Sequence, residues 1–318
     1  MSILDQIATE AGVSAMTVAR VLKGDRAYAR PSAAHRAGRI IAIAERLDYR
    51  PNQAAKAVRT GRFGSIALIL PGAIEGRHLP ADLLDGILAE TEALELHLAI
   101  AREPVQGGHP ARIWRERSVD GVLLVGAMST LQGLSHLPSV TLGIVQPTAS
   151  VYPDACAAGR QATTLLRRLG HRSIVYIAAI NGGLSVQQGY QQGLDGVPSL
   201  VIEPVVGDRA QWARTLLTTP NRPTAVVCAE TGDAMTLLRV AAELGIVIPQ
   251  AISVIAIDSQ AVDVHANGGP TRMALPFRAI GRLGVTQLIT RIAEPTHALP
   301  SLAVPYELRD AGTCVPPL

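Results

Sequence analysis

Two short apolar repeats on either side of a glycine corner constrain the fold of this chain more than any other feature. The repeats have the i, i+1, i+4 and i, i+3, i+4 spacings of buried helix faces. Their members are Ile7, Ala8 and Ala11 in the first repeat and Val18, Val21 and Leu22 in the second. Gly12 supplies the left-handed residue that ends a helix, Val13 fills the corner, and Ser14 is a natural N-cap for the second helix. The pattern predicts two helices that meet at a tight turn.

A third helix completes this N-terminal unit. Ser2 and Asp5 form a capping pair for the first helix, and Ser32 is the expected N-cap of the third. The third helix buries the apolar residues Ile40, Ile41, Ile43, Ala44 and Leu47. It ends before Pro51, because the residue that precedes a proline is pushed out of the helical conformation. Three short helices can share one small core, and we expect an all-α head over residues 1–50.

The pattern has two interpretations. A helix-turn-helix places its second helix in the major groove of DNA, whereas the alternative is an ordinary helical hairpin that faces solvent. The next segment, residues 52–62, is basic and rich in alanine, and it is too short to be a stable isolated helix in water. Such a segment is typical of an element that orders on a partner, which favours the DNA-binding interpretation.

Residues 2–62 closely resemble the DNA-binding head and hinge of the lactose/galactose repressor family of bacterial transcription regulators. The matching segments are Ala11-Gly12-Val13-Ser14, Thr17-Val18, Arg20-Val21-Leu22, Leu47 with Tyr49-Arg50-Pro51-Asn52, and Arg59-Thr60-Gly61-Arg62. The resemblance implies a hinge over residues 51–63, of which residues 52–60 fold in the minor groove of DNA. The family usually inserts a leucine from this hinge between two central base pairs, and Val58 holds that position here.

The resemblance also assigns roles to side chains of the second helix. It implies that Ala15, Met16 and Arg20 face base edges, and that Ser14 and Thr17 contact phosphates. The expected DNA-binding set is completed by Lys23, which replaces a common asparagine, and by Tyr49, Asn52, Ala55, Lys56 and Val58.

The distribution of charge agrees with this assignment. Residues 1–62 hold 11 Lys and Arg against 5 Asp and Glu, whereas the rest of the chain holds 18 against 21. The net charges are therefore +6 and −3, which give the +3 of the whole chain. The basic charge lies where phosphates would bind.

Length and cysteine content limit the class of protein. A chain of 318 residues with 48% hydrophobic residues can bury a sizeable core beyond the head. The three cysteines, Cys156, Cys228 and Cys314, are odd in number and lack a C-x-x-C spacing, which favours a reducing compartment over disulfides or a zinc site. The sequence shows no secretion signal and no apolar run of membrane-spanning length, so we expect a soluble, cytoplasmic protein.

From Gly64 onward, short apolar runs alternate with helical segments in two successive series. The first series has strands over 66–70, 96–100, 121–125 and 140–144, with helices near 80–95 and 109–118. The second has strands over 174–177, 200–202, 225–228 and 253–257, with helices near 156–169, 184–194, 209–218 and 233–244. Continuous buried strands separated by helices predict parallel sheets covered on both faces. Two series predict an α/β core of two doubly wound lobes.

The second series extends the resemblance to the family's effector-binding and dimerisation core, which is similar to periplasmic sugar-binding proteins. The matching residues are Leu169-Gly170-His171-Arg172-Ser173-Ile174, Gly189-Tyr190, Ile252-Ser253-Val254-Ile255 and Asp258. The resemblance implies a core over 64–318 whose lobes exchange chain near 146–150, 275–276 and 303–305. The N-lobe would hold about 64–146 and 277–303, and the C-lobe about 150–275 and 306–318.

Ligands of such sheets bind at the carboxyl ends of the strands, here in the cleft between the lobes. Family members place an arginine three residues before the Gly-aromatic pair, where this chain has Val186, and an Asn-Asp pair where it has Glu230-Thr231. The expected ligand-binding residues are Asp258, Glu230, Val186, Phe277 and Gln146. Two carboxylates without the arginine would repel an acidic metabolite, so the expected effector is neutral or cationic.

Catalysis has little support, because the chain lacks the nucleophile-elbow, Walker, zinc-protease and dinucleotide motifs and its eight histidines are scattered. We therefore expect no enzyme, no cofactor and no metal. The leading hypothesis is a homodimeric repressor that binds a palindromic operator and responds to a small effector. The alternative is a DNA-binding regulator or co-regulator whose degenerate cleft no longer senses a metabolite.

Overall fold

The structure is a computed structural model that describes residues 2–22, 31–50, 57–58, 60–71, 79–102, 118–126, 137–143, 150–179, 184–202, 207–258 and 269–318. The chain divides into two compact units, Met1–Phe63 and Gly64–Leu318, each of which has its own internal contacts. We call them the head and the core and describe each by itself. No helix in the described ranges is both long and apolar enough to cross a membrane.

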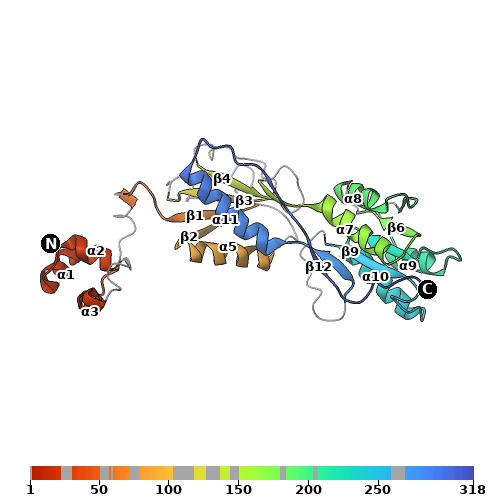
Figure 1. Ribbon diagram of the computed structural model, residues 1–318, viewed down its shortest axis with the longest axis horizontal. Coiled ribbons are helices and arrows are strands. Elements are labelled where there is room, and N and C mark those ends of the chain that lie inside the picture. Colours follow the sequence, from red (N-terminus) through yellow and green to blue (C-terminus); the bar gives the residue numbers. More distant parts are fainter. Residues whose placement is uncertain are drawn as a thin grey trace. The chain divides into compact units, whose positions relative to one another are not determined.

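The head contains α1 (Ile3–Ala11), α2 (Ala15–Leu22) and α3 (Pro31–Arg46) (Figure 1). The three helices surround one small hydrophobic cluster. Ser2 and Asp5 form a reciprocal capping box at the start of α1, and Gly12 ends the helix at φ 67°, as expected. The buried cluster consists of Ile7, Ala8, Ala11, Val18, Val21, Ile40, Ile43 and Ala44. The helix α3 begins at Pro31, so Ser32 lies inside the helix and not at the expected N-cap.

Polar contacts also join α3 to α1. Arg39 Nη2 donates a 2.8 Å hydrogen bond to the Glu10 carbonyl oxygen, and Arg46 forms an ion pair with the Glu10 carboxylate. Two of the basic residues of the head therefore support its fold.

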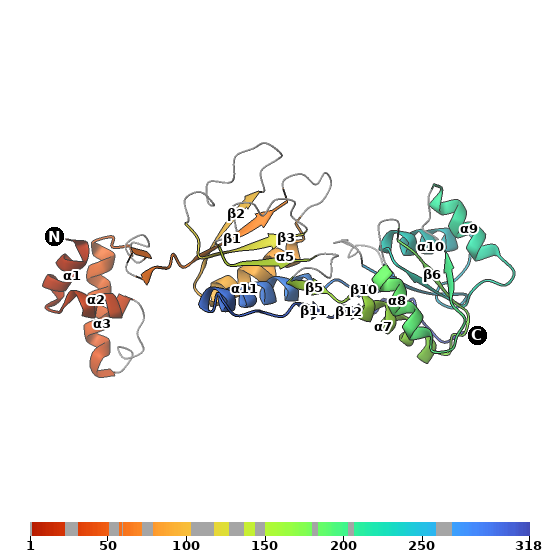
Figure 2. The same cartoon turned by 90° about the horizontal axis from the view of Figure 1, so that it is seen from above.

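The core holds two six-stranded sheets, which confirm the expected α/β class. The first sheet has the order β11-β5-β4-β3-β1-β2 and is parallel throughout. Its strands are β1 (Ser65–Leu70), β2 (His97–Arg102), β3 (Gly121–Val125), β4 (Ser139–Leu142), β5 (Val151–Pro153) and β11 (Leu302–Val304). In Figure 2, α5 (Ala81–Ala93) and α11 (Phe277–Ala293) lie side by side against this sheet. Of the helix expected near 109–118, residues 109–117 lie outside the described ranges.

The second sheet has the order β12-β10-β9-β8-β6-β7. Its strands are β6 (Ile174–Ile177), β7 (Leu200–Ile202), β8 (Ala225–Cys228), β9 (Ser253–Ile257), β10 (Thr271–Ala274) and β12 (Glu307–Arg309). Its helices are α7 (Ala155–Arg168), α8 (Leu184–Leu194), α9 (Arg209–Thr218) and α10 (Thr231–Glu243). The edge strand β12 pairs antiparallel with β10, whereas the other strand pairs of this sheet are parallel.

Alternating side chains explain why this second sheet is buried on both faces. Ile174 and Tyr176 join the hydrophobic cluster that includes α7 and α8, whereas Val175 and Ile177 join the cluster that includes α9 and α10. Because successive strand residues point to opposite faces, the two helix pairs cover opposite faces of the sheet.

The chain passes between the sheets at three places. The strand β5 pairs with β4 and β11 of the first sheet, whereas α7 directly after it packs in the second lobe. The expected boundary near residue 150 is therefore several residues too early. The other two passages lie between β10 and α11 and between β11 and β12. A short strand such as Val151-Tyr152-Pro153 gives no pattern that assigns it to one sheet.

Glycines allow close helix crossings in both lobes. A Cβ atom built at Gly189 of α8 would overlap with the Cys156 carbonyl oxygen of α7. A Cβ atom at Gly281 of α11 would likewise overlap with the Leu83 carbonyl oxygen of α5. Each helix pair therefore approaches to a distance that only glycine permits.

A segment after β12 pairs with the start of β9, where β10 does not reach. Val254 N–H donates to the Thr313 carbonyl oxygen at 2.9 Å, and Thr313 Oγ1 donates to the Val254 carbonyl oxygen at 2.6 Å. The buried His171 side chain holds the same segment, because its Nε2 lies 2.9 Å from the Val315 carbonyl oxygen and its Nδ1 lies 2.9 Å from Thr224 Oγ1. We call residues 311–317 the closing segment.

Candidate DNA-binding helix and ligand site

The outward face of α2 carries the side chains expected to read DNA. Met16 is 74% exposed and Arg20 is also exposed, whereas Val18 and Val21 are buried in the head. Thr17 N–H donates to Ser14 Oγ at 3.2 Å, so Ser14 caps α2 as expected, and the two hydroxyls lie 3.0 Å apart. The side chains at 16, 17 and 20 share one helix face by their spacing. This face presents polar and apolar groups of the kinds that contact phosphates and base edges.

Other members of the expected DNA-binding set have different surroundings. Ala15 and Tyr49 are half-buried and pack against the cluster of the head. Val58 is 89% exposed in a helical stretch that includes Ala57 and Thr60, and Gly61 N–H donates to the Ala57 carbonyl oxygen at 2.8 Å. Lys23, Asn52, Ala55 and Lys56 lie outside the described residues.

The second sheet has a topological switch point between β6 and β8, because the chain turns from there toward both edges. Ligands of open parallel sheets bind beside the carboxyl ends of the strands at such a point. Glu230 lies there, two residues after β8, and Asp258 directly follows the neighbouring strand β9. The topology therefore places both predicted carboxylates at the carboxyl edge of one sheet.

Both carboxylate oxygens of Asp258 have partners inside the protein. Thr231 Oγ1 donates to Oδ1 at 2.6 Å, and Arg272 Nε lies 3.3 Å from Oδ2. Asp258 is 6% exposed, and this burial raises the pKa of its carboxyl, against the opposing effects of Thr231 and Arg272. Its carboxylate thus joins β9 to α10 and β10, and it is not a free acceptor for a ligand.

Glu230 belongs to a second charged group. Arg209, the first residue of α9, places Nη2 3.4 Å from Glu230 Oε2 and Nη1 3.4 Å from Asp233 Oδ1. Asp233 lies in the first turn of α10 and is 2% exposed, and burial raises the pKa of its carboxyl. The Arg209 charge opposes this rise in the pKa, and Glu230 adds to it.

The structure does not bring the other predicted ligand residues to this edge. Val186 is 8% exposed and lies where α8 crosses α7, because a Cβ at Gly159 would overlap with the Val186 carbonyl oxygen. Phe277 is 6% exposed, at the start of α11 of the first lobe. Gln146 lies outside the described residues. The side chains of Val186 and Phe277 are apolar and belong to the buried hydrophobic cluster, and their role at a ligand site stays a prediction.

Four residues of this site were not predicted from the sequence: Arg209, Thr231, Asp233 and Arg272. Together with Glu230 and Asp258 they make a group of two arginines, three acids and a hydroxyl, which we call the strand-end cluster. The prediction of a neutral or cationic effector was based on two carboxylates, and the structure places two arginines beside them. Within the described ranges, no three His, Cys, Asp or Glu side chains gather as metal ligands.

Comparison with known families divides the chain in the same way. Residues 3–52 match the family described as bacterial regulatory proteins, lacI family. Residues 163–314 match the family described as periplasmic binding protein-like domain. The first match spans the three helices of the head, and the second contains most of the second sheet and the strand-end cluster.

Relatives align over most of the chain. The HTH-type transcriptional regulator CelR of Thermobifida fusca is 28% identical and aligns over 92% of each chain. The HTH-type transcriptional repressor PurR of Serratia proteamaculans is 26% identical over 92% of this chain and 91% of its own. Both are regulators of transcription by name.

Solved structures establish the same fold. A crystal structure of the Lac repressor dimer bound to operator and an anti-inducer has a TM-score of 0.64 and 19% identity, with 99% of each chain covered. A complex of the regulator CelR with cellobiose has a TM-score of 0.58 and 24% identity, with 98% of this chain and 99% of the other covered. With its helix-turn-helix head and its two parallel-sheet lobes, the chain combines a lacI-family regulatory domain with a periplasmic binding protein-like domain.

Proposed function

We propose that this protein is a transcriptional repressor that binds a palindromic operator as a dimer and changes its DNA affinity when a small molecule binds the core. The observation that carries the proposal is the exposed face of α2, on which Met16, Thr17 and Arg20 follow a capped helix start. The net charge of +6 over residues 1–62 supports the same assignment, because phosphate contacts dominate affinity for DNA.

A dimer would match two half-sites of a palindrome, since a two-fold axis in the protein requires one in the operator. Exposed apolar side chains for such an interface lie on α5, directly after it and on β2. They are Leu88, Leu94 and Ile100, which are 44%, 42% and 52% exposed. The solved Lac repressor of the same fold is a dimer on its operator.

The strand-end cluster favours an uncharged effector within the expected neutral or cationic class. Arg272 lies beside Asp258, and Arg209 lies beside Glu230 and Asp233. Three carboxyls against two guanidinium groups give the cluster at most one net negative charge. Hydroxyl groups of a polyol can exchange hydrogen bonds with such a cluster without bringing a new charge. The relatives include a regulator solved with cellobiose and a ribose operon repressor.

One observation favours the second candidate, a regulator that does not respond to a metabolite. Val186 and Phe277 are buried, and both oxygens of Asp258 are already engaged. For either candidate we propose that the protein acts in the cytoplasm and does not catalyse a reaction.

Selection of binding sites from random DNA, followed by calorimetry, tests these proposals. We expect enriched sequences with an inverted repeat and a stoichiometry of one dimer per site. A panel of neutral sugars, sugar phosphates, polyamines and nucleosides is then titrated into the protein. A neutral ligand that binds and alters affinity for the selected site supports the first candidate. Absence of binding across the panel supports the second, and absence of any enriched sequence contradicts both.

A further inference from the structure

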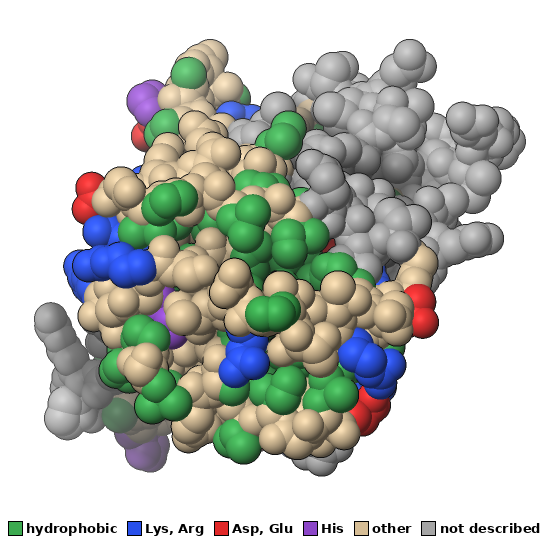
Figure 3. All heavy atoms as spheres, turned by 90° about the vertical axis from the view of Figure 1, so that its right-hand side faces the viewer, with side chains coloured by type: hydrophobic (Ala, Val, Ile, Leu, Met, Phe, Trp, Pro, Cys, Tyr) green, Lys and Arg blue, Asp and Glu red, His purple; other side chains and the backbone are tan. Residues whose placement is uncertain are grey.

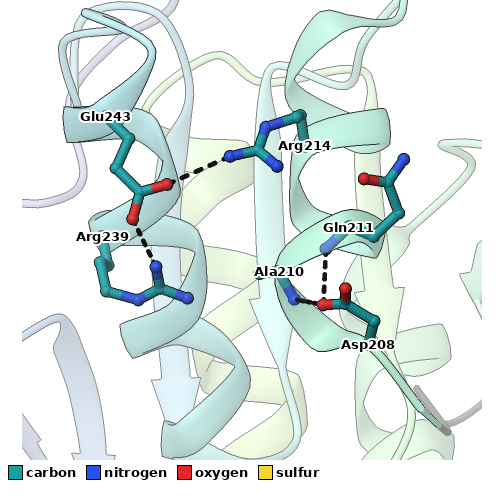
Figure 4. Close-up of polar contacts among 6 residues, drawn as sticks. All are labelled: Asp208, Ala210, Gln211, Arg214, Arg239 and Glu243. Atoms are coloured by element: carbon teal, nitrogen blue, oxygen red, sulfur yellow. Dashed lines mark hydrogen bonds and ion pairs between the residues drawn. The ribbon is translucent and has the colours of Figure 1, made fainter.

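The position of Arg209 differs from those of Arg214 and Arg239, the other two arginines on α9 and α10. Arg209, the first residue of α9, is 36% exposed at its side chain and faces two carboxylates at the N-terminal end of α10. Arg214, farther along α9, pairs with Glu243 at 3.2 Å, and Glu243 also pairs with Arg239 (Figure 4). Arg214 and Arg239 thus share the single carboxylate of Glu243. At the strand ends, in contrast, Arg209 pairs with two carboxylates.

The negative charge of the Asp233 carboxylate is only partly compensated by its neighbours. Its side chain is 3% exposed, and among the described residues its Oδ1 atom accepts no hydrogen bond. The nearest cation is Arg209 Nη1, at 3.4 Å. Burying a carboxylate oxygen that accepts no hydrogen bond and has only this cation beside it costs free energy. The position of Arg209 therefore governs how much negative charge the site presents.

The surroundings of α10 make this charge relevant to a ligand. Glu230 precedes α10 at the switch point and is 21% exposed at its side chain, so solvent and solutes reach it. Gly232 between the two acids leaves room for the guanidinium, because a Cβ there would lie 3.2 Å from Arg209 Nη1. Thr231, in the same turn, is committed to Asp258.

We propose that Arg209 is the residue that sets the charge class of the effector. This proposal rests on the proposed function, since it concerns the ligand site of the same regulator. With Arg209 in place, one of the two negative charges is compensated from within the protein, and a cationic ligand gains less by entering. Without Arg209 the same turn of α10 presents unneutralised carboxylates, and cations are attracted.

The test compares Arg209→Gln with the matched control Arg214→Gln, which breaks an ion pair between the same two helices away from the strand ends. Spermidine is titrated into each full-length variant by calorimetry at low ionic strength. We expect Arg209→Gln to bind spermidine at least about fivefold more tightly than the parent protein, which corresponds to one partly exposed charge contact. Arg214→Gln is expected to match the parent, and adding Glu230→Gln to Arg209→Gln is expected to remove the gain.

Equal spermidine affinities of Arg209→Gln and Arg214→Gln would overturn the proposal. A second variant keeps the test available if Arg209→Gln does not fold. Glu230→Gln leaves Arg209 with one acidic partner, and we expect glucose 6-phosphate to bind at least about fivefold more tightly than to the parent. An unchanged affinity for that anion contradicts the proposal as well. Binding of each variant to the selected DNA site is measured separately, so a failure of the charge assignment is distinguishable from a failure of DNA recognition.

Discussion

Thr231 Oγ1 donates a 2.6 Å hydrogen bond to Asp258 Oδ1, and this contact joins the first residue of α10 to the residue that follows β9. The other oxygen of Asp258 faces Arg272 of β10. One carboxylate therefore links three elements at the carboxyl edge of the second sheet. A ligand that contacts Asp258 must displace one of these partners or bind beside them.

The first prediction concerns the stability of this link. Asp258→Ala leaves the Arg272 guanidinium, which is 14% exposed, without its carboxylate, and we expect a loss of about 3 kcal/mol of unfolding free energy. Chemical denaturation of the full-length protein measures it. Glu307→Ala is the control, because it breaks the exposed pair with Arg309 at the edge of the same sheet and should cost less than about 1 kcal/mol. Similar losses for the two variants would contradict the interpretation of Asp258.

The second prediction concerns pH. Burial lowers the pKa of the His171 imidazole, and its hydrogen bond to Val315 opposes this only in part. Below about pH 6.5 the unfolded chain therefore takes up a proton at His171 that the folded protein resists, so the unfolding free energy falls as the pH falls.

The variant His171→Gln isolates this contribution. The advantage of the parent protein over His171→Gln should narrow from about pH 7.5 to about pH 5, because only the parent loses stability by protonation at this position. Raised carboxyl pKa values at Asp233 and Asp258 act in both proteins and cancel in the difference. Urea titrations across this range measure the advantage, and a constant gap would refute the role of His171.

The third prediction concerns the helix crossing in the second lobe. Gly189→Ala places a methyl group against the Cys156 carbonyl oxygen, so α7 and α8 must move apart, and we expect a loss of about 2 kcal/mol. The matched change Gly38→Ala meets open space on the exposed surface of α3 and should stabilise the head by up to about 1 kcal/mol. Thermal unfolding is followed separately for the head and the core. The midpoint temperature of the core should fall in Gly189→Ala, and that of the head should rise in Gly38→Ala.

The fourth prediction concerns base recognition. Arg20→Ala should weaken binding to a selected site by about 1 to 3 kcal/mol if the guanidinium makes a bidentate base contact. Gel-shift titrations against the selected site and against random DNA of equal length measure the difference. An equal loss on both DNAs would show that Arg20 contacts only the backbone.

The fifth prediction concerns the hinge. Ala57, Val58 and Thr60 are helical, but a single turn is far shorter than an isolated helix that is stable in water. We expect rapid amide exchange over residues 52–60 in the free protein and slow exchange on the operator, with Val58 docked in the minor groove. Strong protection of residues 53–59 in the free protein would rule this out.

Sequence patterns predicted the long apolar strands and their helices but not the short edge strands. Runs such as Gly121–Val125 are continuous, apolar and buried, and this pattern is typical of strands in a parallel sheet. The three residues Glu307–Arg309 are all exposed, and they form β12 only because β10 offers a free edge. A tertiary partner, and not a local pattern, makes such a strand.

The ligand site could likewise be predicted from the sequence only in part. Glu230 and Asp258 could be predicted because each follows a buried strand. Arg209 and Arg272 could not, since no local spacing relates the start of α9 or the middle of β10 to those carboxylates. The order of the strands brings Arg272 beside Asp258, and the packing of α9 against α10 brings Arg209 beside Glu230. The burial of Val186 where α8 crosses α7 likewise depends on tertiary packing.

On the ribosome, the three passages of chain between the two sheets impose an order of completion. The first sheet needs α11 and β11, and the start of β9 needs Thr313 of the closing segment, so both lobes wait for chain that is synthesised late. The head is contiguous in sequence and can fold as soon as residues 1–50 have emerged. A growing chain therefore possesses its DNA-reading surface well before it possesses the part that regulates it.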